Sequence, residues 1–197
     1  MSLQTIVSLT LLAMLVFWAV GAYNRLVRLK NIIANAFGQI DVQLKRRYDL
    51  IPNLVEAAKK YLKHELVTLE AVISARNQAR SASDTVRSRP GKADAVIALA
   101  AAEQTLDSSL GRLFALAEAY PELKADQTIR ELSEELTSTE NKVGFARQAY
   151  NDAVLDYNNA QGQFPALLVA RLFGFAPSAM LQATENAVER QAVRIQM

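Results

Sequence analysis

The sequence contains no cysteine and only one histidine, His64, among its 197 residues. This composition excludes disulfides, thiol nucleophiles and zinc sites built from cysteine and histidine. It also excludes a di-iron site of the helical-bundle type, which needs Glu-x-x-His pairs on two helices. A Gly-rich phosphate loop and a nucleophile elbow are missing as well. We therefore predict no catalytic residue, no metal and no cofactor, and we expect that the protein is not an enzyme.

Excess charge of one sign and helix-breaking residues are also scarce. The formal net charge is +2, and a single small basic cluster without interleaved aromatics argues against nucleic-acid binding. Hydrophobic residues make up 51% of the chain and charged residues 21%, which excludes a disordered polar chain. Five prolines and seven glycines indicate that most of the chain forms long helices.

One uncharged hydrophobic run is present, at the N-terminus. Residues 3–22 are mainly apolar and would form about 30 Å of helix, enough to span a bilayer. A cleaved signal peptide is the rival interpretation, but the usual positively charged start is missing. We predict a retained single-pass anchor over residues 1–23, with membrane lipid as its partner.

Basic residues follow the run and none precedes it. Arg25, Arg28 and Lys30 come directly after the span, and Trp18 and Tyr23 lie near its inner end, where interfacial aromatics are favoured. The positive-inside bias then predicts a protein of the bacterial cytoplasmic membrane with its N-terminus outside and the long remainder in the cytoplasm.

Beyond the anchor, apolar residues recur at steps of three and four, the period of an amphipathic helix. This spacing predicts helices over residues 23–48, 52–83 and 93–119, with a loop over 84–92. It also predicts a longer helix from Ile129 to Phe164, whose apolar stripe keeps a heptad spacing typical of a coiled coil. Since such stripes must bury one another, we predict an all-α fold, an antiparallel up-and-down four-helix bundle. At Pro52 the spacing continues without interruption, so a tight turn and a single kinked helix compete, and we favour the turn.

The segment from Ile40 to Glu56, IDVQLKRRYDLIPNLVE, closely resembles the signature of the LemA family. Further matching motifs follow in order at the expected spacing: His64-Glu65 with Thr68-Leu69-Glu70, Ala75-Arg76, Tyr120 to Ala125, Tyr150-Asn151 with Tyr157-Asn158, and Phe164-Pro165. The resemblance implies a single-pass bacterial membrane protein with a four-helix cytoplasmic bundle and no established enzymatic activity. It also implies that the protein partners include membrane proteases or their regulators. Phe37-Gly38 and residues 129–133 depart from the family pattern, and residues after Pro177 match it poorly.

A second basic trio, Lys45, Arg46 and Arg47, lies beyond the first. Residues 1–50 hold six basic and two acidic side chains, a net +4, whereas the other 147 residues hold 16 and 18, a net −2. The trio lies about 33 Å along a helix from the span, too far for lipid headgroups. We predict either a contact with a protein partner or a solvated helix end.

Several polar residues occupy positions on the apolar stripes. Glu65, Arg76 and Glu103 stand where leucine is expected, and we predict a buried polar network that sets helix register, with a carboxylate acid pair as the alternative. Tyr150-Asn151 and Tyr157-Asn158 repeat at a seven-residue interval on the last helix. We assign them to the same polar core, with a tyrosine-lined ligand groove as the alternative.

A short apolar stretch near the C-terminus includes Phe164, Phe173 and Phe175. In an up-and-down bundle the last helix returns towards the bilayer and carries this stretch with it, so it either contacts the membrane or caps the bundle. We expect three parts: the anchor at 1–23, the bundle at 24–176 and a tail at 177–197. The predicted function is non-enzymatic, an interaction or scaffold module with a membrane-associated protein partner. A structural homo-oligomer is the main alternative, and a carboxylate-dependent enzyme or ligand-binding bundle is a further one.

Overall fold

The computed structural model describes residues 2–181, and within them every regular element is a helix. The elements are α1 (Leu3–Lys59), α2 (Leu66–Ser88), α3 (Ala93–Ala117), α4 (Pro121–Ala125), α5 (Gln127–Gly162) and α6 (Ala166–Leu172). The prediction of an all-helical chain is confirmed.

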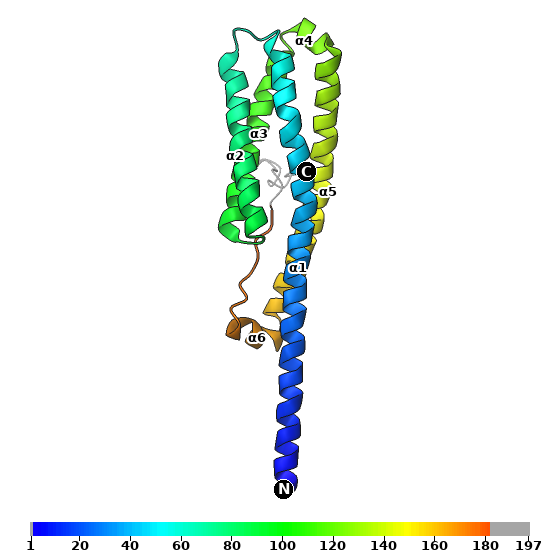
Figure 1. The fold of residues 1–197 in the computed structure, drawn as a ribbon, viewed down its shortest axis with the longest axis vertical. Coiled ribbons are helices and arrows are strands. Elements are labelled where there is room, and N and C mark those ends of the chain that lie inside the picture. Colours follow the sequence, from blue (N-terminus) through cyan, green and yellow to red (C-terminus); the bar gives the residue numbers. More distant parts are fainter. Residues whose placement is uncertain (1, 182–197) are drawn as a thin grey trace, which may run out of the picture.

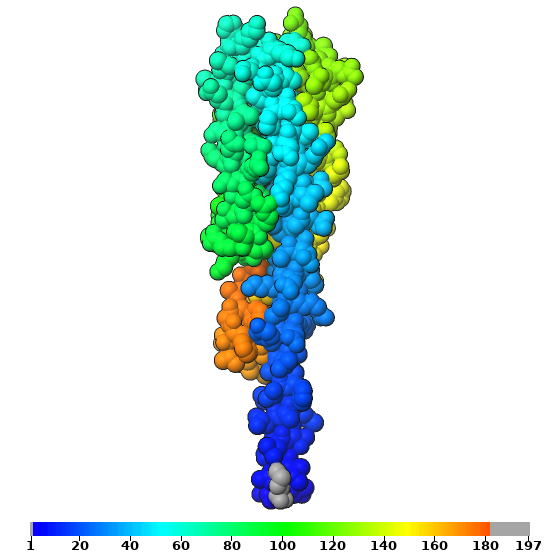
Figure 2. All heavy atoms as spheres, in the orientation of Figure 1, coloured from blue at the N-terminus to red at the C-terminus, as the bar shows by residue number. Residues whose placement is uncertain are grey.

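Helix α1 carries both the apolar run and the centre of the fold. It has 57 residues, about 85 Å of helix at 1.5 Å per residue. Its N-terminal part projects alone, away from the other helices (Figures 1 and 2). In the described chain α1 is the one helix long and apolar enough to cross a membrane, and none of its most apolar window is buried. A row of exposed leucines and valines of this kind is characteristic of a surface meant for lipid and not for water.

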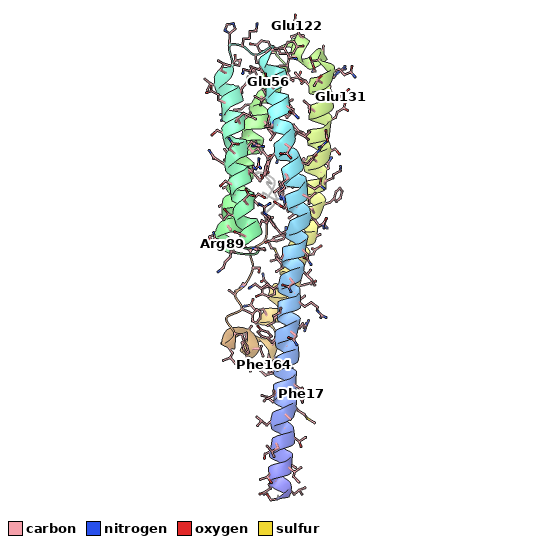
Figure 3. All side chains as sticks on the ribbon, in the orientation of Figure 1. Phe17, Glu56, Arg89, Glu122, Glu131 and Phe164 are labelled. Carbon is pink, nitrogen blue, oxygen red and sulfur yellow. The ribbon has the colours of Figure 1, made fainter. Side chains whose placement is uncertain are left out.

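The other half of α1 packs with α2, α3 and α5, which we call the helical body. α5 packs along α1, α3 along α2, and α2 against α1, while the short helix α4 joins α3 to α5 at the end far from the N-terminus (Figure 1). The buried stripe of α1 supplies the central row of the core, with Ile33, Phe37, Ile40, Leu44 and Tyr48 each about 1% exposed. Figure 3 shows Glu56 and Glu122 near the same end of the body.

The predicted turn at Pro52 is wrong, because α1 continues through this proline to Lys59. Proline has no N–H to give to the carbonyl four residues earlier, which here belongs to Tyr48. Arg76 of α2 supplies the missing donor, since its Nε donates to the Tyr48 carbonyl at 2.9 Å. The side chain from the neighbouring helix therefore satisfies the carbonyl that Pro52 leaves without a partner, and so offsets part of the cost of an interior proline.

This arrangement predicts a coupling between Pro52 and Arg76. Arg76→Met should cost about 1.5–3 kcal/mol of unfolding free energy, because a charged donor to a buried carbonyl is lost. In a Pro52→Ala background the cost should shrink, since the N–H at position 52 can then bond to the Tyr48 carbonyl. Chemical denaturation of the four proteins would measure the coupling. Arg80→Met, which removes an exposed arginine one turn further along α2, is the control. An equal cost in both backgrounds would contradict this explanation.

The actual turn lies at residues 60–65, where the sequence has lysines, a histidine and a glutamate but no glycine or proline. Leu62 is fully buried there, and the Tyr61 hydroxyl donates to Asp126 Oδ2 at 2.9 Å. Asp126 also caps α5 by accepting from the Ile129 N–H at 3.1 Å, and this hydrogen bond, together with Tyr61, holds the pKa of Asp126 below its usual value. Tertiary contacts, and not a local breaker, therefore place the turn.

Two further boundaries differ from the prediction. The predicted helix over 52–83 is divided between α1 and α2, and α2 continues to Ser88, so the loop before α3 covers only residues 89–92. Phe164 lies beyond the end of α5 and is 81% exposed, so it is not part of the buried stripe of that helix.

Candidate functional site

A buried ion-pair network lies in the middle of the helical body. Arg47 of α1 is 5% exposed, and its Nη1 donates to Glu103 Oε2 of α3 at 2.7 Å. Its Nη2 donates to Asp107, also on α3, and Glu140 Oε2 of α5 lies 3.0 Å from Nη1. The Tyr48 hydroxyl donates to the second oxygen of Glu103. One arginine thus joins three helices through three carboxylates, a set we call the Arg47 cluster.

Burial and charge act in opposite directions on the pKa values of this cluster. Burial raises the pKa of Glu103, and the lowering effect of Arg47 and of the Tyr48 hydrogen bond does not fully offset it. Burial alone would lower the pKa of Arg47, but the charges of Asp107, Glu140 and Glu103 outweigh it and raise that pKa. The pKa of Tyr48 is raised by burial and by the neighbouring Glu103. Arg47 is therefore firmly cationic, and Tyr48 stays a neutral donor.

The Arg47 cluster opens to solvent through a cleft of about 380 Å³ between α3 and α5, which we call the α3–α5 cleft. Arg47 lies at its floor, and Asp107 and Glu140 line its two sides. Leu110, Phe114 and Leu136 supply apolar surface. The formal charge of the cluster is −2, one arginine against three carboxylates. Glu140 Oε2 is buried and forms no well-aligned hydrogen bond within the described residues. The cleft is thus a partly apolar recess with surplus negative charge.

The predicted surface role of Arg47 is wrong, because its side chain is buried by its carboxylate partners. Its neighbours stay at the surface. Lys45 Nζ binds Asp41 Oδ2 at 2.7 Å, and Arg46 Nε binds Glu135 of α5 at 2.9 Å. Each of the three basic residues is therefore engaged within the chain. The physical reason is helical spacing, since consecutive residues on a helix point about 100° apart and only one of the three can face the core.

The predicted polar core residues are not brought together as one network. Glu103 is buried with Arg47, whereas Arg76 serves the Tyr48 carbonyl on the other side of α1. The core position predicted for Glu65 is wrong, because this residue lies half-exposed in the turn before α2 and its side chain caps nothing. Its place on the stripe assumed a helix from Pro52 onwards, and the turn at 60–65 removes it from that stripe.

Several polar core residues were missed by the sequence prediction. Asp107 follows Glu103 by four residues and so lies on the same face of α3, a signal that was available. Asp41 is buried, where it accepts from Ser83 Oγ at 3.2 Å and lies 3.4 Å from Arg87 Nη1, both on α2. Glu140 had no such signal, because it lies beside the stripe of α5 and faces the cluster only through the packing of three helices.

The Tyr-Asn repeat of α5 binds an extended segment of the same chain. Asn158 Nδ2 donates to the Ser178 carbonyl and its Oδ1 accepts from the Ser178 N–H, each at 2.9 Å. Asn151 makes the same pair of bonds with Leu181, again at 2.9 Å. Tyr150, Tyr157 and Gln161 donate to the carbonyls of Ala179, Ala176 and Phe175. We call these five α5 side chains the α5 clamp; they bind backbone groups only.

The clamped segment also touches the loop between α2 and α3. The Ala179 N–H donates to the Gly91 carbonyl at 3.2 Å, and a Cβ on Gly91 would come within 2.7 Å of Ser178 Oγ. Gly91 has a φ of +79°, so both its backbone angle and this close approach favour glycine. Burial raises the pKa of Tyr150 to about 12 and raises that of Tyr157. Residues 177–181 of the predicted tail therefore pack against the helical body, whereas residues 182–197 lie outside the described residues.

The residues predicted for the membrane interface gather at the lower end of the helical body. The ring of Tyr23 makes edge-to-face contacts with Phe173 and Phe175, with centroids 4.9 and 5.5 Å apart. Arg25, Arg28, Lys30 and Trp18 are exposed on α1. Figure 3 shows Phe164 beside α1, close to the projecting part that carries Phe17.

Comparison with known proteins agrees with the motifs and the fold. The family model described as "LemA family" matches residues 36–197. The curated "Protein LemA" of Metamycoplasma hominis is 27% identical over 169 residues, which cover 86% of this chain and 73% of that protein. The matched range 36–197 contains the residues of the Arg47 cluster, the α3–α5 cleft and the α5 clamp. On the extent of the family match, this chain belongs to the LemA family.

Proposed function

We propose that the chain is a single-pass protein of the bacterial cytoplasmic membrane whose helical body, an up-and-down four-helix bundle, binds another membrane-associated protein. The continuity of α1 supports the anchoring part, because one helix runs from an exposed apolar segment into the core of the body. Arg25, Arg28 and Lys30 follow the span directly, which supports an outside N-terminus and a cytoplasmic body.

The observation that carries the interaction role is the surplus negative charge in the α3–α5 cleft. A cationic side chain of a partner would add a second positive charge to a cluster of three carboxylates and one arginine. It would also supply a well-aligned donor for the buried Glu140 Oε2, whose contact with Arg47 Nη1 at 3.0 Å is an ion pair without hydrogen-bond geometry. The apolar walls at Leu110, Phe114 and Leu136 favour a long side chain with an apolar stem. The proposed ligand is thus an arginine or lysine presented by a partner protein.

A binding role fits this site better than acid-base catalysis. A carboxylate pair used in catalysis needs one group that can gain and lose a proton beside a substrate. Glu103 has a raised pKa, but it lies beneath Arg47 and holds both that cation and the Tyr48 hydroxyl. The two carboxylates that reach solvent, Asp107 and Glu140, face the arginine. The LemA family is likewise not known as an enzyme family, which supports a non-enzymatic role.

The proposal can be tested with a photoreactive residue in place of Phe114, at the mouth of the cleft. Irradiation of intact cells should give a discrete protein adduct, and the same residue at Gln78, exposed on α2, should not give it. Glu140→Gln should lower the adduct yield several-fold, because it halves the surplus charge. Glu134→Gln removes an exposed charge from the same helix and is the matched control. Equal yields from the two glutamate variants would contradict the proposed site.

A structural homo-oligomer is a second candidate, and one observation favours it. Val42 of α1 and Phe145 of α5 are 60% and 75% exposed on the helical body, away from the membrane-spanning segment. Such side chains are suited to a contact with a second copy. The mass of the purified protein in detergent, compared between wild type and a Phe145→Ser variant, would distinguish a stable oligomer from a monomer.

A further inference from the structure

The short helix α6 lies against α1 at the point where the uncharged segment ends. Val169 and Ala170 are buried, and the Phe173 and Phe175 rings that follow pack on Tyr23. Tyr23 directly follows residues 3–22, the uncharged run. These contacts set the position of α6 along the α1 axis to within about one helical turn of the end of the proposed span.

Large apolar side chains on α6 and directly beside it in the sequence are exposed. Phe164, Leu168, Leu172 and Phe173 are 81%, 56%, 79% and 57% exposed, and we call these four residues the α6 foot. Leu168 and Leu172 lie four residues apart and therefore on the same face of the helix. Four large apolar side chains within ten residues form an unusual surface for water, and such patches mark a contact with a protein or a membrane.

The position of the foot identifies which contact it makes. The exposed residues of the span continue directly to the level of α6, so lipid that surrounds the span also meets the foot (Figure 2). Arg25 and Arg28 on α1 and Arg171 on α6 are exposed beside it, where they can reach lipid phosphates. Apolar side chains next to basic ones at the boundary of the hydrocarbon are the pattern of an interfacial membrane helix.

We propose that the α6 foot inserts into the interfacial layer of the bilayer leaflet next to the helical body. The protein then contacts the membrane at two places, the α1 span and the foot. Because a single helix could tilt and rotate freely, the second contact fixes the orientation of the body above the membrane, and with it the direction in which the α3–α5 cleft opens. This inference rests on the proposed membrane anchoring, and the experiment separates the two.

The test places a single fluorescent side chain at three depths in the full-length protein. Trp18 is the only tryptophan, so Trp18→Phe provides the background. Into it we place Phe164→Trp in the foot, Leu12→Trp in the middle of the span, and Phe145→Trp, which is as exposed as the foot but about 25 Å up α5 from its lower end. The proteins are reconstituted into vesicles of phosphatidylcholine and phosphatidylglycerol. The phosphatidylcholine carries bromine either near the carbonyl end or near the methyl end of its chains.

If the α6 foot lies in the interfacial layer, we expect quenching that depends on the depth of the bromine. The Phe164→Trp emission should fall about twofold with shallow bromine and much less with deep bromine, as expected for interfacial depth. Leu12→Trp should respond most to deep bromine, and Phe145→Trp to neither. If Leu12→Trp is quenched and Phe164→Trp behaves like Phe145→Trp, the membrane span is supported and the proposed insertion of the α6 foot is wrong. If only Phe164→Trp is quenched, the foot contacts lipid but the proposed span is wrong. Deep quenching of Phe164→Trp would overturn the interfacial depth.

Discussion

Replacing Arg47 with methionine is expected to lower the free energy of unfolding by about 3–5 kcal/mol, the usual cost of leaving a buried charge without its partner. The charge left without its partner is that of Glu103, whose side chain is 7% exposed. Glu103 would keep only the Tyr48 hydroxyl as a hydrogen-bond donor. Denaturant titration of the full chain in detergent measures the loss. The neighbouring substitution Arg46→Met is the control, since its pair with Glu135 is exposed and worth about 0–1 kcal/mol.

The effect of Arg47→Met should depend on pH in a direction that the pKa of Glu103 determines. Burial already raises that pKa in the wild type, and removal of Arg47 removes the main group that lowers it. A carboxyl group with a higher pKa in the folded chain than in the unfolded chain causes no loss of stability below the unfolded pKa of about 4.3. Above that pH the unfolded chain ionises first, so stability is lost as the pH rises through the folded pKa. The penalty should therefore be smallest near pH 4 and should grow towards neutral pH.

A second substitution tests whether the stranded charge is the cause. Glu103→Gln in the Arg47→Met background keeps an acceptor for Tyr48 but removes the charge, and it should recover about 2 kcal/mol or more. If Arg47→Met costs no more than Arg46→Met, or if Glu103→Gln recovers nothing, the Arg47 cluster does not stabilise the body as described.

The double variant Asn151→Ala, Asn158→Ala should loosen residues 178–181 on α5. Each asparagine makes two hydrogen bonds to the backbone of this segment, and a bond of this kind contributes about 1 kcal/mol net. The four bonds together correspond to about 4 kcal/mol, a roughly thousand-fold rise in the open population of the segment. Hydrogen exchange of the Ser178 and Leu181 amides, both donors to the clamp, measures this directly.

The control for the clamp is Asn159→Ala, which removes an exposed asparagine from the same turn of α5. It should leave exchange at Ser178 and Leu181 unchanged. Because the double variant acts on the segment and not on the core of α5, the amides of the Val143 region should keep their protection. Unchanged exchange in the double variant, or an equal loss of protection throughout α5, would show that the clamp does not hold the segment locally.

The elements most accessible to prediction were those with long, regular apolar spacing. The stripes over 93–119 and 129–164 correspond closely to α3 and α5. A helix that buries one face needs apolar residues at steps of three and four, and this spacing is visible in the sequence. The uncharged run over residues 3–22 likewise indicated the exposed part of α1. These features depend only on local spacing and composition.

The course of the chain between Tyr48 and Leu66 could not be predicted in this way. Pro52 is a local signal for a break, but a donor from another helix, Arg76, makes the unbroken helix acceptable. The real turn has no local signal, because it depends on Leu62 reaching the core and Tyr61 reaching Asp126. The misplacement of Glu65 follows from this single difference.

The sequence by itself determined that this protein is helical, that it carries an uncharged segment of bilayer length, and that cysteine chemistry plays no part in it. Only the tertiary structure decided that Arg47 faces inward to three carboxylates, that the Tyr-Asn repeat binds a segment of backbone, and that α6 lies level with Tyr23. The physical reason is the range of the interactions. Periodicity and composition act along one helix, whereas ion pairs and backbone hydrogen bonds between distant residues exist only after several helices have packed together.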